Sequence, residues 1–171
     1  MPGEMAAQGI PSHWNIWVAG DADQVVERAA AAGVWEAGEH IAAGVVEEPG
    51  AMTWWEVNTR AFEESKRFYG EVFGWSAEPL DAPGVNYALW KLDGRTVGGM
   101  LEMTAEWGEI APHWMTYFAV TDTDRAASRA TELGGSVGAP PFDTANGRIA
   151  VLVDPAGGHF SVVTPTRPPA G

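Results

Sequence analysis

The chain has 171 residues, of which 46% are hydrophobic, nine are tryptophan and none is cysteine, and its formal net charge is −13. The missing cysteine excludes disulfides, thiolate metal sites and cysteine nucleophiles. The 10 lysines and arginines form no basic cluster, which argues against nucleic acids and anionic membranes as partners. With no apolar run long enough to span a membrane and no leader-like start, we expect a cytoplasmic protein of one domain, or one domain plus a fragment.

The chain contains an internal repeat. The stretch "HWNIWVAGDAD" begins at His13, and "HWMTYFAVTDTD" begins at His113. Each is typical of an aromatic, β-branched strand that leads into a short alanine-rich helix. Each helix has an aspartate to cap its start and a glycine to end it: Asp21 and Gly33 in the first copy, Asp122 and Gly134 in the second. The shared His-Trp pair and the acidic cap predict a duplicated unit.

The first copy is shorter than the second. After its glycine the chain runs directly into "VWEAGEHIAAGVVEEPG". If the Val-Trp of residues 34–35 corresponds to the Val-Val of residues 162–163, the 27 residues 135–161 have no upstream counterpart. Residues 1–35 therefore predict the remnant of a first domain, and 36–51 a linker. A lone strand and helix leave backbone groups and apolar side chains uncovered, so we expect a homodimer; docking of the remnant on its own domain stays open.

Another β-α unit lies between the linker and the second copy. The stretch "MTWWEVNT" over 52–59 predicts a strand that carries Trp54, Glu56 and Asn58 on one face. Thr59 is the expected cap of a helix over 60–73. Further strands are predicted near 75–79, 85–92 and 95–103. Residues 52–103 and 112–163 thus share one β-α-β-β-β pattern.

This paired pattern resembles a known superfamily. The stretches "FEESKRFYGEVFGW", "HWMTYFAVTDTDRAASRATELGG" and "VLVDPAGGHFSVV" are similar to the vicinal oxygen chelate superfamily of glyoxalases, bleomycin-resistance-type binders and extradiol dioxygenases. The resemblance implies an α+β domain over 52–164, in which paired βαβββ modules form an open, cup-shaped mixed sheet with helices on the outside. Residues 165–171 remain as a tail. The remnant and linker resemble the subgroup that carries two such domains in tandem.

The resemblance also locates a potential metal site. Metal-using members place His or Glu on the first, fourth, fifth and eighth strands of the domain. Matched residue by residue, these positions fall on Trp54, Glu102, Met115 and Ser161. Only Glu102 suits a divalent cation, so the metal site is expected to be lost and no cofactor is expected. A displaced divalent-metal site remains the alternative, built from Glu56, His113 and His159.

The candidate ligand site follows from the same positions. If they face into the cup, strand alternation brings in their neighbours. The predicted ligand-binding residues are Trp54, Glu56, Asn58, His113, Met115, Tyr117, His159 and Ser161. Glu56 and Glu102 are the candidate acid or base residues. A carboxylate between tryptophans on a central strand needs a cavity or a partner, because burying it alone is costly. His113 fits equally well as a capped, half-buried residue that begins a strand.

The leading functional hypothesis is metal-independent binding of a small, partly apolar organic ligand, as in bleomycin-resistance-like or sequestering proteins. One alternative is a metal-dependent lyase or isomerase of the glyoxalase type, with Glu56 or Glu102 as the base on the carbon beside a polarised carbonyl. Another is a degenerate remnant that binds nothing. No Gly-x-Ser-x-Gly or His-Glu-x-x-His motif occurs, and the sequence leaves enzymatic activity undecided.

Overall fold

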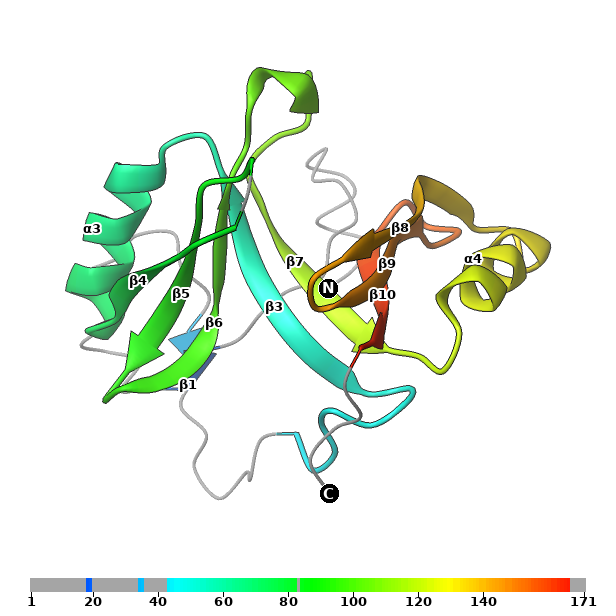
Figure 1. Cartoon of the computed structure of the whole chain (residues 1–171), viewed down its shortest axis with the longest axis horizontal. Helices are drawn as coiled ribbons and strands as arrows, with labels where there is room; N and C mark the ends of the chain where they lie inside the picture. The colour runs from blue at the N-terminus through cyan, green and yellow to red at the C-terminus, as the bar shows by residue number, and fades with distance from the viewer. Residues whose placement is uncertain (1–17, 20–33, 36–42, 83, 167–171) are drawn as a thin grey trace. The chain divides into compact units, whose positions relative to one another are not determined.

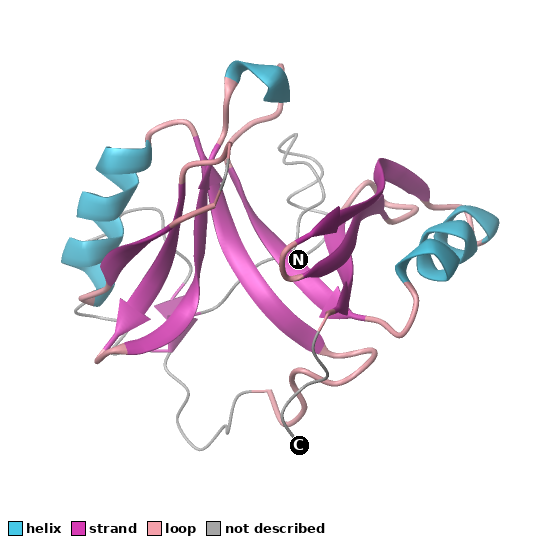
Figure 2. Cartoon of the chain, in the orientation of Figure 1, coloured by secondary structure: helices cyan, strands magenta, loops and turns pink. Residues whose placement is uncertain are grey.

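The structure is a computed structural model, and it describes residues 18–19, 34–35, 43–82 and 84–166. Two compact units divide the chain. We call the unit that contains residues 55–114 the first module, and the unit that contains 45–54 and 115–166 the second module. The boundaries between the units fall within the strands at 52–59 and 113–119, which therefore contribute residues to both. Figures 1 and 2 show the helices and strands of both. No helix in the described ranges is long and apolar enough to cross a membrane.

The first module contains one α-helix and the short 3-10 helix η1 (Ala105–Trp107), and it is built on four strands in the order β4-β5-β6-β3. Its elements are β3 (Met52–Thr59), α3 (Phe62–Phe73), β4 (Ser76–Leu80), β5 (Tyr87–Leu92) and β6 (Arg95–Glu102). Neighbours among β4, β5 and β6 pair in antiparallel fashion, whereas β3 and β6 are parallel. A parallel pair needs a long connection, which α3, β4 and β5 supply.

Helix α3 is bounded by backbone conformations that its sequence favours. Gly74 follows the helix with a left-handed φ of 72°, and its N–H bonds to the carbonyl of Gly70, as expected at a helix C-terminus. At the other end, the prediction that Thr59 caps the helix is wrong. Ala61 occupies the cap position, and the Thr59 hydroxyl instead accepts the N–H of Ala61 at 3.1 Å.

Aromatic side chains fill the core of the first module. Trp90 and Met100 are completely buried. The ring of Trp55 lies so close to β6 that a Cβ atom on Gly98 would approach it to 2.7 Å, which explains the glycine at that position. The core cluster is completed by Val57, Phe62, Trp75 and Ala88. This core occupies the face of the sheet that α3 covers.

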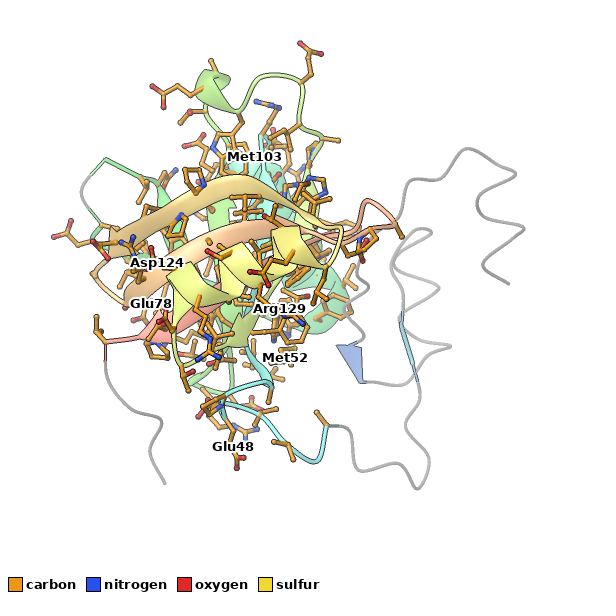
Figure 3. The ribbon with its side chains drawn as sticks, turned by 90° about the vertical axis from the view of Figure 1, so that its right-hand side faces the viewer. Glu48, Met52, Glu78, Met103, Asp124 and Arg129 are labelled. Atoms are coloured by element: carbon orange, nitrogen blue, oxygen red, sulfur yellow. The ribbon has the colours of Figure 1, made fainter. Side chains whose placement is uncertain are left out.

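The second module repeats the connectivity of the first, with strand order β7-β10-β9-β8. Its elements are β7 (His113–Ala119), α4 (Thr123–Glu132), β8 (Ser136–Thr144), β9 (Gly147–Val153) and β10 (His159–Pro165). As predicted, Asp122 caps α4, because its Oδ1 accepts the N–H of Arg125 at 2.9 Å. Figure 3 shows α4 lying across β8, β9 and β10. The core beneath it is small and aliphatic, made of Ala127, Ala150, Leu152 and Val162.

The predicted fold class is confirmed. Strands β3 to β10 form one mixed, open sheet with β4 and β8 at its edges, and each module has one α-helix. The predicted domain spans residues 52–164, and the sheet runs from Met52 at the start of β3 to Pro165 at the end of β10. The cup shape, which depends on the arrangement of the two modules, stays a prediction.

Two short strands precede this sheet, β1 (Val18–Ala19) and β2 (Val34–Trp35). They pair in parallel, with Val18 opposite Val34. In the second module β7 and β10 are also parallel, with Phe118 opposite Val162. This is the register that the internal repeat requires, since Val18 matches Phe118 and Val34 matches Val162. The helix predicted between β1 and β2, most of the linker and the end of the tail lie outside the described residues.

Candidate ligand-binding site

Glu56 is a buried carboxylate in the middle of β3. It is 4% exposed, and its Oε2 accepts a hydrogen bond from the Tyr87 hydroxyl of β5 at 2.8 Å. Between them, on β6, the register places Gly99 opposite Glu56, so no side chain separates the carboxylate from the phenol. Because strand alternation sends Trp55 and Val57 into the core, Glu56 projects to the opposite face of the sheet.

Asn58 and His113 form a second polar pair on this face. Asn58 is 1% exposed, and its Nδ2 lies 3.1 Å from His113 Nε2. The other ring nitrogen, Nδ1, lies 2.8 Å from the carbonyl oxygen of Ala111. A carbonyl only accepts and an amide nitrogen only donates, so the contacts assign the proton of a neutral imidazole to Nδ1. Asn58 Oδ1 is buried and has no partner among the described residues.

Glu102 belongs to a different contact. It ends β6 in register with Thr59, and its Oε2 accepts a hydrogen bond from Asn86 Nδ2 at 3.0 Å. The register places Glu56 opposite Gly99 and Asn58 opposite Leu101, so these four residues share one face of the sheet. Glu102 directly follows Leu101, and alternation along β6 therefore directs it to the other face. The structure therefore brings Glu56, Asn58 and His113 to one region of β3, and gives Glu102 a separate partner.

Arg60 fixes the loop that leads from β6 to His113. Its guanidinium donates to three backbone carbonyls, those of Thr104 at 3.1 Å, Gly108 at 2.7 Å and Ile110 at 3.0 Å. Sequence reasoning missed both Arg60 and Tyr87. No local pattern predicts that one guanidinium will reach three carbonyls of a distant loop, and Tyr87 becomes a partner of Glu56 only through the pairing of three strands.

The remaining predicted residues lie in the second module. Met115 and Ser161 are buried, at 4% and 0% exposure, and Ser161 pairs with Tyr117 across β7 and β10. The Ser161 hydroxyl has no hydrogen-bond partner in the described part of the chain. His159 is exposed at the start of β10, and Trp54 is half-buried in β3. Their roles as ligand-binding residues stay predictions.

The residues at the family's metal positions do not fit a divalent cation. Of the set Trp54, Glu102, Met115 and Ser161, only Glu102 supplies a suitable oxygen, and it is bonded to Asn86. The alternative set fits no better, because both ring nitrogens of His113 already have contacts and Glu56 holds Tyr87. Over the residues described, no cluster of three or more His, Asp or Glu could hold a metal ion.

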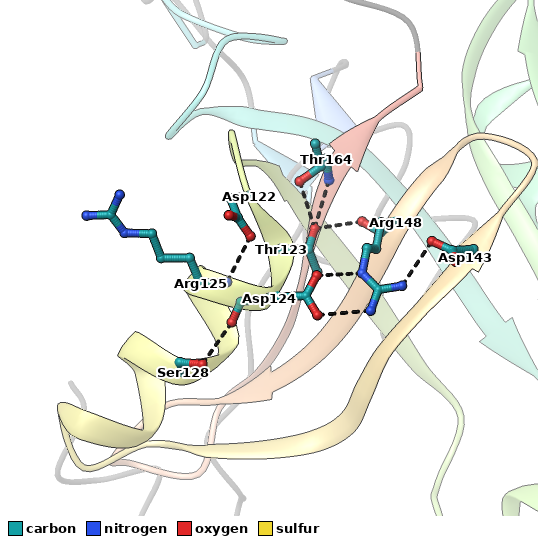
Figure 4. A network of polar contacts seen from close by, with 8 residues as sticks. All are labelled: Asp122, Thr123, Asp124, Arg125, Ser128, Asp143, Arg148 and Thr164. Atoms are coloured by element: carbon teal, nitrogen blue, oxygen red, sulfur yellow. Dashed lines mark hydrogen bonds and ion pairs between the residues drawn. The ribbon is translucent and has the colours of Figure 1, made fainter.

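A polar network at the start of α4 has a structural role (Figure 4). The Thr123 hydroxyl donates to the carbonyl of Arg148 at 2.7 Å and accepts the N–H of Thr164 at 3.0 Å. The Arg148 guanidinium contacts Asp124 at 2.6 Å and Asp143 at 3.0 Å. Its hydrogen bond lowers the pKa of Asp124, and the two carboxylates together raise the pKa of Arg148. Arg148, Asp124 and Asp143 thus each have an oppositely charged partner in this network.

Tyr69, in the aromatic core, also has a shifted pKa. Burial raises the pKa of Tyr69, and a hydrogen bond with Trp114 opposes this shift. The ring of Tyr69 packs between α3 and the sheet, 5.6 Å from the centre of Trp90 and 5.2 Å from that of Trp114. The shift has the sign expected of a phenol in an apolar core, and Tyr69 belongs to packing and not to the candidate site.

Comparison with known proteins places this geometry in context. The sequence profile of the glyoxalase-like domain matches residues 54–163. The protein named "Putative glyoxylase CFP32" of Mycobacterium bovis is 34% identical over an alignment of 191 positions, gaps included, which covers 94% of this chain and 72% of that protein. The anthracycline biosynthesis protein DnrV of Streptomyces peucetius is 33% identical, over 91% of this chain and 66% of its own length.

Solved structures show the same fold. Methylmalonyl-CoA epimerase of Streptomyces coelicolor, in complex with 2-nitronate-propionyl-CoA, superposes with a TM-score of 0.51 at 19% identity. The match covers 72% of this chain and all of the epimerase chain. A methylmalonyl-CoA epimerase bound to methylmalonyl-CoA gives the same TM-score at 20% identity. At this identity the likeness concerns the arrangement of helices and strands alone.

Proposed function

Because the chain belongs to the glyoxalase-like domain family, we propose that it binds a small, partly apolar organic molecule on the Glu56 face of the first module. The observation that carries this proposal is the buried carboxylate of Glu56, with Tyr87 bonded to it and the Asn58–His113 pair two residues along the strand. A fold that needed only stability would place an apolar side chain there, because burying polar groups is costly. Binding a ligand accounts for this cost.

The proposed binding needs no resident metal. The four positions that would hold a metal in the family carry an indole, a carboxylate, a thioether and a hydroxyl, which is not a ligand set for zinc, nickel or iron. The ligand would instead be held by hydrogen bonds and apolar contact, as in the bleomycin-resistance kind of binder. The names of the relatives, a glyoxylase and proteins of anthracycline biosynthesis, are compatible with a small organic ligand.

Two measurements test this function. Elemental analysis of protein purified without a chelator should find far less than one metal ion per chain. A fragment library of acids, amines and neutral compounds, screened by ligand-observed NMR, should give compounds that bind the wild type and bind Glu56→Gln more weakly. One zinc, nickel or iron per chain, or a set of fragments that all bind Glu56→Gln as well as the wild type, would contradict the proposal.

A second function is favoured by the Glu56–Tyr87 contact. A buried carboxylate oriented by a phenol is also suited to act as a general base. In that case the protein is an isomerase or lyase, and Glu56 removes a proton from the carbon beside a carbonyl. Wild-type protein would then exchange that hydrogen for deuterium in D₂O, on small 2-oxo compounds such as methylglyoxal, and Glu56→Gln would not. Ligand binding without exchange would contradict this enzymatic function and leave binding as the only supported one.

We also propose that residues 1–35 are the remnant of a first glyoxalase-like domain, equivalent to part of the second module, and that the chain forms a homodimer through this remnant. The shared register of β1–β2 and β7–β10 supports the first part. The alignment with the mycobacterial relative supports it too, since its 191 positions exceed the 171 residues of this chain, so gaps must fall within this chain. Light scattering on the full chain should show a dimer, and a chain that starts at Val45 should be a monomer. A monomeric full chain would refute the dimer.

A further inference from the structure

We propose that the ligand of the Glu56 face is a hydrogen-bond donor that carries a positive charge or none, such as an amine or an alcohol, and that anions are excluded. This inference rests on the proposed function and narrows it to one class of ligand. It depends on three features of the first module: an unpartnered acceptor, donors already engaged within the protein, and the positions of the cationic side chains.

The unpartnered acceptor is the amide oxygen of Asn58. The side chain is 99% buried, with 1% exposure, and Oδ1 has no hydrogen-bond partner among the described residues. Buried amide oxygens are almost always satisfied, and an unsatisfied one in a native fold calls for a water or a ligand. Since Glu56 and Asn58 leave β3 on the same side, a group that donates to Oδ1 also approaches the carboxylate.

The donors of the site are directed inward. The single O–H of Tyr87 is donated to Glu56. The Nδ1–H of His113 is donated to the Ala111 carbonyl, and an N–H of Asn58 to His113. The carboxylate of Glu56, when ionised, can only accept. A ligand that approaches this face therefore meets mainly acceptors, since one N–H of the Asn58 amide is the donor that these contacts leave over. A ligand rich in acceptors, such as a carboxylate or a phosphate, would find few donors there.

The cations of the first module lie off the Glu56 face or are already paired. Arg60 is bound to three loop carbonyls, and Lys66 to Glu63. Arg67 is exposed on α3, and Arg95 is exposed at the start of β6. Helix α3 covers the opposite face of the sheet, so neither Lys66 nor Arg67 reaches the Glu56 face. Lys91 shares the face of Tyr87 on β5, but its ammonium group is held by Glu78 and Thr96. Within the described residues, the module therefore offers the site no unpaired cation for an anionic ligand.

The whole chain has the same bias. Its formal charge of −13 produces a potential that attracts cations and repels anions. The fold neighbours were crystallised with CoA esters, which are anionic. This chain shares their fold, but the Glu56 face of its first module has no free basic group to bind such a ligand. We therefore expect it to bind a different class of ligand.

Three probes of similar size test the charge preference. They are 2-phenylethylamine, a cation; 2-phenylethanol, a neutral donor; and 3-phenylpropionate, an anion. Dissociation constants come from isothermal titration or from quenching of tryptophan fluorescence at neutral pH, with propionyl-CoA as a fourth probe. The amine should bind at least about tenfold more tightly than the anion, the effect expected of a charge-assisted hydrogen bond, and propionyl-CoA should not bind.

Matched variants locate the effect. Glu56→Gln should remove most of the preference for the amine and leave the affinity for the alcohol within about threefold. Glu71→Gln removes the same charge from an exposed residue of α3, on the opposite face of the sheet, and should change neither. If the anion or propionyl-CoA binds as tightly as the amine, or if Glu71→Gln acts like Glu56→Gln, the charge inference is wrong while the binding function stands. If none of the four probes binds at millimolar concentration, both are wrong.

Discussion

The two modules share one topology but use their polar side chains differently. In the second module, Thr123 and Arg148 tie the start of α4 to β9 and β10, and each has its partners. In the first module, Glu56 and Asn58 are more deeply buried than Arg148, yet Asn58 Oδ1 has no partner among the described residues. Satisfied polar networks stabilise a fold, whereas partly satisfied ones cost stability. The difference indicates that the polar groups at the start of α4 support structure, whereas those of β3 serve the proposed function. Ser161, whose buried hydroxyl also has no partner among the described residues, lies outside the α4 network.

The largest expected effects come from the cores. Trp90 is completely buried among aromatic rings, and Trp90→Ala should lower the free energy of unfolding by about 3–5 kcal/mol. In the aliphatic core of the second module, Leu152→Ala should cost about 2–4 kcal/mol. Urea denaturation measures both. Trp90→Phe, which also removes an indole N–H that has no partner among the described residues, should cost clearly less. A loss below about 1 kcal/mol for Trp90→Ala would contradict the description of this core.

A pair of glycine substitutions compares the packing of the two sheets. A methyl group on Gly98 would lie 2.7 Å from the ring of Trp55, whereas on Gly138 of β8 it would meet Val151 at an ordinary 3.4 Å. Gly98→Ala should therefore destabilise the protein by about 1–3 kcal/mol through overpacking, and Gly138→Ala should leave stability nearly unchanged. Thermal denaturation of both variants measures the difference. Equal effects would mean that Trp55 does not pack against β6 as described.

Isosteric changes test the division between structure and function. Thr123→Val removes the hydroxyl at the centre of the Figure 4 network and should cost about 1–3 kcal/mol, without altering the affinity for small ligands. Glu56→Gln should do the reverse, with nearly unchanged stability and weakened binding. Denaturant titration and a binding assay on both variants give four values. The comparison fails if the variant that loses stability is also the one that loses binding.

The smallest effect is the pH dependence that Asp124 contributes. Arg148 lowers the pKa of this exposed carboxyl in the folded state, so its stabilising effect is present above the unfolded pKa of about 4 and is lost as the pH falls through the lower, folded pKa. Tm measured as a function of pH should show Asp124→Asn slightly less stable than the wild type near neutral pH. The gap should close in acid; a gap that widens there would have the wrong sign.

The sequence alone was sufficient for the fold. Two βαβββ patterns, the Asp122 cap and the alternation that places Glu56 and Asn58 together all depend on local periodicity, and local periodicity survives into the structure. The family resemblance added the pairing of the modules. The failed Thr59 cap shows the limit at helix ends, where one residue of shift moves a side chain away from the cap position.

The contacts of the site could not be predicted in the same way. Tyr87 meets Glu56 because β5 pairs with β6 in one register and β6 with β3 in another. Register is a long-range property, and one residue of slip would send Tyr87 to the other face. The three carbonyls that hold Arg60 belong to a loop more than 40 residues away, which no short pattern reports.

The most direct test of the central claim maps where a ligand binds. Amide chemical shifts of ¹⁵N-labelled protein, followed during titration with whichever of 2-phenylethylamine and 2-phenylethanol binds more tightly, locate the site without any mutation. The account predicts the largest shifts at Glu56, Asn58 and Tyr87 in the first module, and little change around Thr123 and Arg148. Shifts centred on the start of α4, with the Glu56 strand unaffected, would contradict it.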